Sequence, residues 1–315
     1  MQQSAFDSMH NLRDLAGTPV ARGGTAAQLR PGLLLRSATP ADAEQKDVDQ
    51  LLSALPSLSV LDLRSEPDAL CDDGPRLLAD RTRHVEMLPK VTGQKRLTRH
   101  VLTDRLHVTL PLLPARICRA LPIPFVQGWG QRKTDKGVRK FLETIDLADV
   151  YWWILSERKE ALKQVLSEVS EAGRSGQATL VHCAHGKDRT GVVIAVLLHI
   201  CGADVQTIAN DYACSDEWGC SPKGQDIMLN AMPERYRERI SEWNTPGEDE
   251  VPADEEPPRF WWSQFGRWCG ADAKTMVEVF ARVERKYGSM DAYLDSIGFD
   301  AAQRAELQEA FTCEA

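Results

Sequence analysis

The stretch of sequence that decides the fold reads Val181-His182-Cys183-Ala184-His185-Gly186-Lys187-Asp188-Arg189-Thr190-Gly191. The short apolar segment 178–182 leads into it and predicts a buried strand. The almost entirely apolar segment 190–201 follows and predicts a buried helix, with Gly202 as its C-cap. The residues between these two elements therefore form a tight loop that joins the end of a strand to the start of a helix.

A loop of this length suits a phosphate group. Its backbone amides can point at one centre, and the helix N-terminus adds partial positive charge at the same place. Arg189 would add a bidentate fork to two phosphate oxygens. The pattern predicts an anion-binding cradle whose substrate-binding residues are His182, Ala184, His185, Gly186, Lys187, Thr190 and Gly191.

The positive potential of the loop amides, the helix N-terminus and Arg189 should also act on Cys183. A free thiol has a pKa near about 8.5, and a helix N-terminus with nearby cations lowers it to roughly 3.5–7.5. Cys183 would then be a thiolate at neutral pH and would attack the phosphorus of a bound monoester to give a phosphocysteine. Thr190 could donate its hydroxyl to the sulfur, and Arg189 would stabilise the transition state.

The leaving oxygen needs a general acid, and two carboxyl groups are candidates. Asp188 lies within the loop, whereas Asp62 ends a second apolar segment, and active sites of open α/β sheets lie at such strand ends. The choice between them is geometric, so both stay open at this stage.

The neighbouring polar residues have supporting roles in this interpretation. His182 is expected to hydrogen-bond and support the loop. Lys187, beside an anion cradle, is expected to contact a second phosphate or the leaving group. Arg36 and Arg64 are expected to be structural ion-pair partners near the site.

The rest of the chain alternates between strand and helix patterns. Segments 33–37 and 59–64 predict buried strands, and segments 41–55 and 151–172 predict helices. The tail from residue 271 onward is also helical in pattern. This alternation predicts an α/β protein with a central mixed sheet flanked by helices.

The domain organisation follows from length and composition. The 315 residues suit one domain, with an irregular, proline-interrupted insertion at about 90–150 and an acidic, proline-rich loop at about 244–258. The tryptophan-rich segment 259–268 is expected to cover the core of its own domain.

Composition excludes several classes of function. The net charge is −8 with no basic stripe, so no nucleic-acid partner is expected. The eight cysteines form neither a CxxC pair nor a zinc-finger pattern, which predicts free thiols, no metal and no cofactor. The chain has neither a stretch of about 18 apolar residues nor a signal-peptide pattern, and we therefore expect a cytoplasmic protein.

The loop His182-Cys183-x-x-Gly186-Lys187-Asp188-Arg189-Thr190-Gly191 resembles the signature of the cysteine-based protein tyrosine phosphatases. Its Lys-Asp pair is similar to that of one branch, the atypical lipid phosphatases and bacterial tyrosine/serine phosphatases. Segments 11–17, 35–38, 62–66, 211–212 and 287–298 resemble other motifs of the family in the expected order.

This resemblance implies a phosphatase-like fold, with Cys183 as nucleophile and Arg189 binding phosphate. It also implies that Asp188 serves as the acid and that Lys187 favours phosphoinositide headgroups. The expected substrates are phosphotyrosine proteins, phosphoinositides or both, with transient membrane contact in the lipid case. Three alternatives remain: a non-catalytic phosphate-binding module, a soluble inositol phosphate phosphatase, and a cysteine enzyme such as a sulfurtransferase.

Overall fold

The protein was analysed as a computed structural model. The structure describes residues 6–64, 69, 74–87, 146–230 and 266–315. The expected insertion at about 90–150 lies outside these residues apart from its last few positions. The acidic loop at about 244–258 and most of the tryptophan-rich segment also lie outside them.

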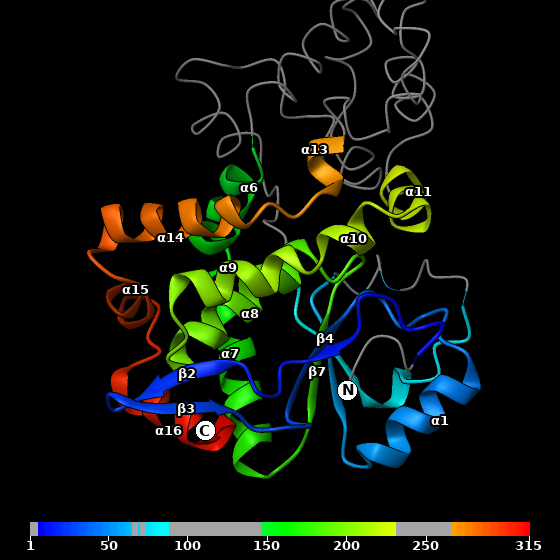
Figure 1. The fold of residues 1–315 in the computed structure, drawn as a ribbon, viewed down its shortest axis with the longest axis horizontal. Helices are drawn as coiled ribbons and strands as arrows, with labels where there is room; N and C mark the ends of the chain where they lie inside the picture. The colour runs from blue at the N-terminus through cyan, green and yellow to red at the C-terminus, as the bar shows by residue number, and fades with distance from the viewer. Residues whose placement is uncertain (1–5, 65–68, 70–73, 88–145, 231–265) are drawn as a thin grey trace, which may run out of the picture. The chain divides into compact units, whose positions relative to one another are not determined.

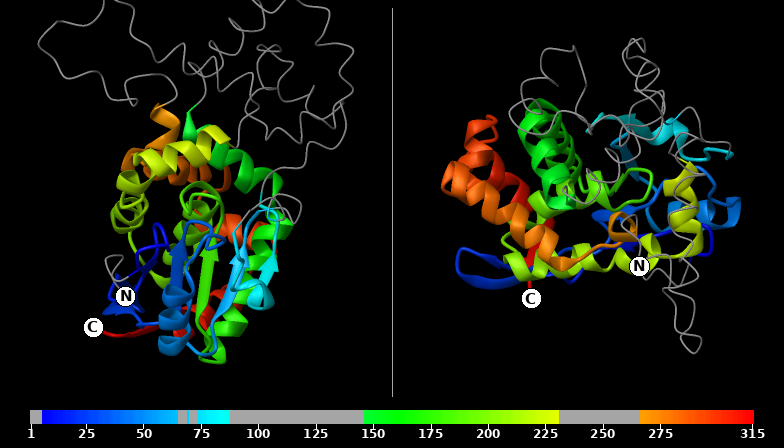
Figure 2. Two further views of the ribbon diagram at one scale, coloured as in Figure 1. Left: turned by 90° about the vertical axis from the view of Figure 1, so that its right-hand side faces the viewer. Right: turned by 90° about the horizontal axis from the view of Figure 1, so that it is seen from above.

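The core of the fold is a five-stranded sheet in the order β1-β4-β7-β5-β6. The strands β4, β7, β5 and β6 are parallel to one another, and β1 is antiparallel at one edge. Figure 2 shows the parallel strands side by side. Their bounds are β1 Arg13–Asp14, β4 Leu34–Ser37, β5 Ser59–Asp62, β6 Thr82–His84 and β7 Thr179–His182.

Helices cover both faces of this sheet (Figure 1). On one face, α1 (Gln45–Ala54) packs its apolar side against Leu35, Val60 and Leu180, which are paired neighbours on three adjacent strands. Side chains alternate along a strand, so Leu61 and Val181 face the opposite side. There the sheet is covered by α7 (Lys159–Arg174) and α8 (Asp188–Cys201). The prediction of a mixed sheet flanked by helices is therefore confirmed.

A second, smaller sheet was not anticipated from the sequence. It consists of three antiparallel strands in the order β2-β3-β8. These strands are β2 Pro19–Arg22, β3 Thr25–Leu29 and β8 Thr312–Glu314. The pairing of β3 with β8 ties the C-terminal helical tail to the first 30 residues.

The helical tail is present as predicted. The helix α14 (Ala273–Tyr287) has an amphipathic pattern and buries Met276, Val279 and Val283. It packs against α9 (Val205–Ala213). The remaining helices are η2 Ala79–Arg81, α6 Leu147–Glu157, α10 Asp216–Gly219, α11 Pro222–Asn230, α13 Gly266–Cys269, α15 Met290–Ser296 and α16 Ala301–Phe311.

Three predicted helix boundaries differ from the structure. The helix expected over 41–55 is α1, which begins only at Gln45. The single helix expected over 151–172 is two helices, α6 and α7, which meet at Arg158. Arg158 has φ −113° and ψ 33°, and its guanidinium donates to the carbonyl of Glu86. The apolar pattern does not reveal this break, because Leu155 and Leu162 are seven residues apart, as in a continuous helix. The helix that follows the Cys183 loop, α8, begins at Asp188 rather than at residue 190.

The chain divides into two compact units. The first holds both sheets and spans Met1–Pro89, Ala148–Trp218 and Ala271–Ala315. In the second, Lys90–Leu147 and Gly219–Gly270, the described residues include α11 and α13, which contact each other. Within the described ranges, no helix combines the length and the apolar character needed to cross a bilayer.

Candidate active site

The predicted loop leaves the sheet at its central strand. β7 ends at His182, the loop starts at Cys183, and α8 begins at Asp188. Cys183, His185, Gly186, Lys187 and Thr190 are buried, while Asp188 and Arg189 are partly exposed in the first turn of α8. The site is thus at the carboxyl end of a parallel strand, where open α/β sheets bind ligands.

Three consecutive carbonyls of the loop are held from outside it. The amide of Thr39 donates to the carbonyl of Ala184 at 3.0 Å. The side-chain amide of Asn11 donates to the carbonyls of His185 and Gly186 at 3.1 and 3.2 Å. A trans peptide group is planar, with its N–H opposite its C=O, and the described residues contain no cis peptide bond. The amides that follow these carbonyls therefore point into the loop, as an anion cradle requires.

The close approach of the loop to β4 depends on Gly186. Its φ is +64°, in the left-handed region, and a Cβ atom there would lie 2.1 Å from the carbonyl oxygen of Ser37. A side chain at this position would be strained in its backbone and would also collide with a neighbouring strand.

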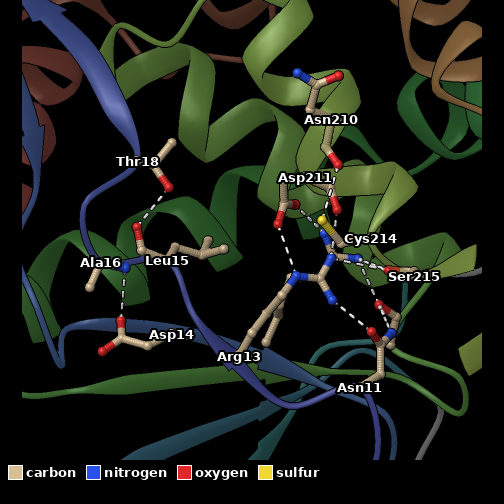
Figure 3. Close-up of polar contacts among 12 residues, drawn as sticks. Asn11, Arg13, Asp14, Leu15, Ala16, Thr18, Asn210, Asp211, Cys214 and Ser215 are labelled. Carbon is tan, nitrogen blue, oxygen red and sulfur yellow. Dashed lines mark hydrogen bonds and ion pairs between the residues drawn. The ribbon is translucent and has the colours of Figure 1, made fainter. Parts of the chain in front are cut away.

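An arginine network supports the same loop (Figure 3). Arg36, which is fully buried on β4, donates to the carbonyl of Gly186 at 2.7 Å and pairs with Asp211 of α9. Arg13 donates to Asp211 at 3.0 Å and to the side-chain oxygen of Asn11 at 2.6 Å. Asp211 thus joins Arg36, which binds a loop carbonyl, to Arg13, whose partner Asn11 binds loop carbonyls. Burial acts to raise the pKa of Asp211, but the charges of the two arginines outweigh it and keep that pKa low.

The electrostatics of the loop favour a thiolate at Cys183. Burial is the largest single influence and acts to raise the pKa of its thiol. The charge of Arg189 and the interactions with the hydroxyl and amide of Thr190 outweigh burial and the opposing charge of Asp188, so the pKa of Cys183 is lowered. Burial instead raises the pKa of Cys201, at the far end of α8, to about 12.

The guanidinium of Arg189 has one hydrogen-bond donor group that no described residue satisfies. Its Nη1 atom is buried and has no hydrogen-bond partner among the described residues. A buried guanidinium nitrogen without a partner is costly, because its hydration is lost and not replaced. An anion in the cradle would supply that partner.

The two candidate acids lie in different surroundings. One oxygen of Asp188, Oδ1, accepts from the hydroxyl of Tyr151 at 2.6 Å and lies 2.9 Å from Nζ of Lys187. The side chain of Asp188 is nevertheless 25% exposed. Lys187, which the sequence analysis expected to contact a ligand, has a fully buried side chain.

Asp62 lies on β5 directly beside His182 of β7, in register with it. It is buried and accepts from Arg64 through both oxygens, at 3.0 and 2.8 Å. Burial opposes its ionisation, but His182 and Arg64 outweigh that effect and lower the pKa of Asp62 to about 2. Asp62 is therefore a carboxylate held in a buried ion-pair cluster.

This cluster predicts a pH-dependent contribution to stability. The pKa of an unfolded aspartate is about 3.9, so the contribution of Asp62 is complete above that pH and is lost as the pH falls toward about 2. We expect Asp62→Asn to lower the free energy of unfolding at pH 7. The difference from wild type should shrink by about 2 kcal/mol between pH 6 and pH 2. Urea denaturation across this range measures it, and a pH-independent difference would contradict it.

The sequence analysis missed the supports of the loop. It assigned no role to Asn11, Arg13 or Asp211, although all three lie in segments that it compared with family motifs. Tyr151 was recognised only as the start of a helix. Apart from the bond between Arg13 and Asn11, the cited contacts of these residues join positions more than 30 residues apart in the chain, which local spacing does not report.

A central strand, a tight loop and a buried helix in this order form the arrangement with which many α/β proteins bind anions at a helix N-terminus. The sequence profile of the tyrosine phosphatase family matches residues 4–313. The chain therefore belongs to the tyrosine phosphatase family.

One curated relative gives a more limited match. A tyrosine-protein phosphatase of Nostoc commune is 28% identical to this chain over 182 residues, which make up 57% of this chain and 53% of that protein. The chain thus matches about half the length of this relative.

Proposed function

We propose that this protein is a cysteine-dependent phosphomonoesterase that acts on phosphotyrosine and passes through a phosphocysteine intermediate. The observation that carries the proposal is the buried Cys183 thiol, whose pKa is lowered chiefly by Arg189 against the effect of burial. Family membership and the name of the Nostoc relative support the class of substrate.

In the first step, the Cys183 sulfur would form a bond to phosphorus while the bond from phosphorus to the leaving oxygen breaks. The inward-pointing amides and Arg189 would bind the three equatorial oxygens, where negative charge accumulates. In the second step, water would displace the sulfur and release phosphate. The leaving oxygen must also receive a proton, which calls for a general acid beside the cradle.

We propose Asp188 rather than Asp62 as the group that protonates the leaving oxygen. Asp188 is partly exposed, and its charge acts to raise the pKa of Cys183, so it lies near the reacting sulfur. Asp62 is buried, and both its oxygens are bound to Arg64. Asp62 could donate a proton to a substrate only by breaking its contacts with Arg64.

The resemblance to lipid phosphatases depended on Lys187 as a headgroup contact. Its ammonium instead pairs with Asp188 at 2.9 Å, and its side chain is fully buried. A second phosphate would therefore have to compete with Asp188 for a lysine that is not exposed. For this reason we rank phosphoinositides, and the membrane contact that they would involve, below phosphotyrosine.

Phosphate release from a substrate panel tests this proposal. The panel contains a phosphotyrosine peptide, a phosphoserine peptide and mono- and bis-phosphorylated phosphoinositides, with EDTA present throughout and Cys183→Ser as the blank. We expect the wild type to act fastest on the phosphotyrosine peptide. Faster release from a phosphoinositide would overturn the substrate class, and binding of phosphate without any release would indicate a phosphate-binding module.

A further inference from the structure

Three polar side chains, from the loop and two helices, meet behind Asp188. Lys187 precedes it in the loop, Tyr151 comes from α6, and Tyr212 comes from α9. The hydroxyl of Tyr151 donates to Oδ1 of Asp188 at 2.6 Å and lies 2.7 Å from the hydroxyl of Tyr212. Tyr151, Tyr212 and Lys187 all have fully buried side chains. A buried cluster of this kind is ordered, because each polar atom needs a partner.

The protons in this cluster can be assigned by counting donors. Tyr151 has a single hydroxyl proton and donates it to Asp188, so its oxygen accepts the proton of Tyr212. The result is a directed chain from Tyr212 to Tyr151 to Asp188. Burial raises the pKa of Tyr151 well above its ordinary value and that of Tyr212 to about 12. Both hydroxyls therefore keep their protons at neutral pH.

Lys187 adds a second donor to the same carboxyl oxygen. Its ammonium lies 2.9 Å from Oδ1 of Asp188 and carries protons but no acceptor. An oxygen that accepts from both a hydroxyl and an ammonium is a poor place for an acid proton. When Asp188 is protonated, its proton must therefore lie on Oδ2.

We propose that Tyr151 and Lys187 are positioning residues that bind Oδ1 of Asp188 and thereby confine its acid proton to Oδ2, with Tyr212 supporting Tyr151. This inference rests on the proposed function and deepens it. It assigns a role to two tyrosines that lie outside the loop and to a fully buried lysine that pairs with Asp188.

The proposed hydrolysis proceeds in two steps. The thiolate of Cys183 bonds to phosphorus, and the electron pair of the breaking P–O bond goes to the leaving oxygen. That oxygen takes the proton from Oδ2, which leaves Asp188 as a carboxylate. In the second step, water bonds to phosphorus, Oδ2 recovers one proton from that water, and Cys183 leaves as a thiolate.

The charges around Asp188 determine its pH behaviour. The groups that face it are Lys187, His185 and Cys183 from the loop, Tyr151 from α6 and Tyr212 from α9. Burial acts to raise the pKa of Asp188, but Lys187, the hydrogen bond from Tyr151 and His185 outweigh it and lower the pKa. Removing the hydroxyl of Tyr151 removes a stabiliser of the carboxylate, so the pKa of Asp188 should rise.

Tyr151→Phe tests the inference, with Tyr293→Phe as the matched control. Tyr293 is equally buried, but its hydroxyl donates to the carbonyl of Leu155 at 2.7 Å and does not touch Asp188. The readouts are kcat and the pH profile of kcat/KM for an aryl and an alkyl phosphate. Asp188→Asn identifies the limb of the profile that belongs to Asp188, because that limb disappears in this variant.

We expect Tyr151→Phe to move the Asp188 limb to higher pH. Its kcat should fall about tenfold on the alkyl phosphate, whose poor leaving group needs the acid, and less on the aryl phosphate. Tyr293→Phe should leave the limb in place. If Tyr151→Phe does not fold, Tyr212→Phe should move the same limb in the same direction by a smaller amount.

A Tyr151→Phe profile that coincides with that of Tyr293→Phe, with equal losses on both substrates, would overturn the inference. Failure of the proposed function would look different. In that case the wild type itself would release no phosphate from the aryl substrate, or Cys183→Ser would release as much as the wild type. When the wild type releases phosphate from the aryl substrate and Cys183→Ser does not, the tyrosine variants report on the positioning of Asp188 alone.

Discussion

Cys183→Ser should lower phosphate release from a phosphotyrosine peptide by about 10⁴-fold or more, as loss of a catalytic nucleophile does elsewhere. The reason is electrostatic. The loop lowers the pKa of the Cys183 thiol, mainly through Arg189 acting against burial. The same field cannot bring a serine hydroxyl, which is a far weaker acid, into the neutral range. The side chains differ by one atom, so the cradle should remain intact.

Initial rates of release and direct binding of inorganic phosphate together measure this effect. We expect the serine variant to bind phosphate while turning over no substrate. Cys201→Ser is the matched control, because it removes a buried thiol at the far end of α8, and burial raises the pKa of that thiol to about 12. The control should retain wild-type activity. Full activity in Cys183→Ser would place the nucleophile elsewhere.

Gly186→Ala should be the most damaging conservative change in the loop. The new Cβ atom would lie 2.1 Å from the carbonyl oxygen of Ser37 and 2.5 Å from the amide nitrogen of Ala38, in a backbone with φ +64°. The loop must move away from β4, which breaks the contacts of Gly186 with Asn11 and Arg36. A displacement of about 1 Å at a reacting centre costs on the order of 100-fold in rate.

Gly176→Ala separates the two causes of this damage. Gly176 has φ +68°, but its Cβ position has no atom within 4 Å. It therefore bears the cost of a left-handed alanine alone, about 1 kcal/mol, at a turn remote from the loop. We expect Gly186→Ala to lose clearly more stability than Gly176→Ala in urea denaturation, and it alone should lose activity. Equal effects would show that the contact with β4 is unimportant.

The parts of the fold that the sequence predicts are those encoded locally. The strand before Cys183, the loop and the helix after it are contiguous, and their hydrophobic patterns are clear. The strand β8 escapes prediction because it pairs with β3 across more than 280 residues. The β2–β3 hairpin is local, and its turn at Gly23 and Gly24 is a hairpin signal that the sequence interpretation overlooked. Arg158 divides a predicted helix because it reaches the carbonyl of Glu86, which lies about 70 residues earlier.

The candidate site also has a part that the local sequence predicts and a part that depends on contacts distant in the chain. Cys183 and Arg189 belong to one short segment, so their proximity can be read from the sequence. The choice between Asp62 and Asp188 depends on partners that spacing does not reveal: Arg64 holds one carboxylate, whereas Tyr151 and Lys187 hold the other. The burial of Lys187 is likewise a property of the packed structure, because a lysine in a loop is ordinarily exposed.

The position of β7 in the middle of the sheet has a consequence for synthesis of the chain. β7 hydrogen-bonds to β4 on one side and to β5 on the other, and those two strands do not touch. During translation, β4 and β5 must wait for residue 182 to leave the ribosome, an interval on the order of ten seconds. Through that interval β7, the strand that lies between β4 and β5, is missing. The apolar residues of β4 and β5 therefore lack this partner: Leu34, Leu35, Val60 and Leu61. Exposed apolar surface and unpaired strand edges favour aggregation, so we expect the nascent chain to be most prone to aggregate before the strand that carries the loop is made.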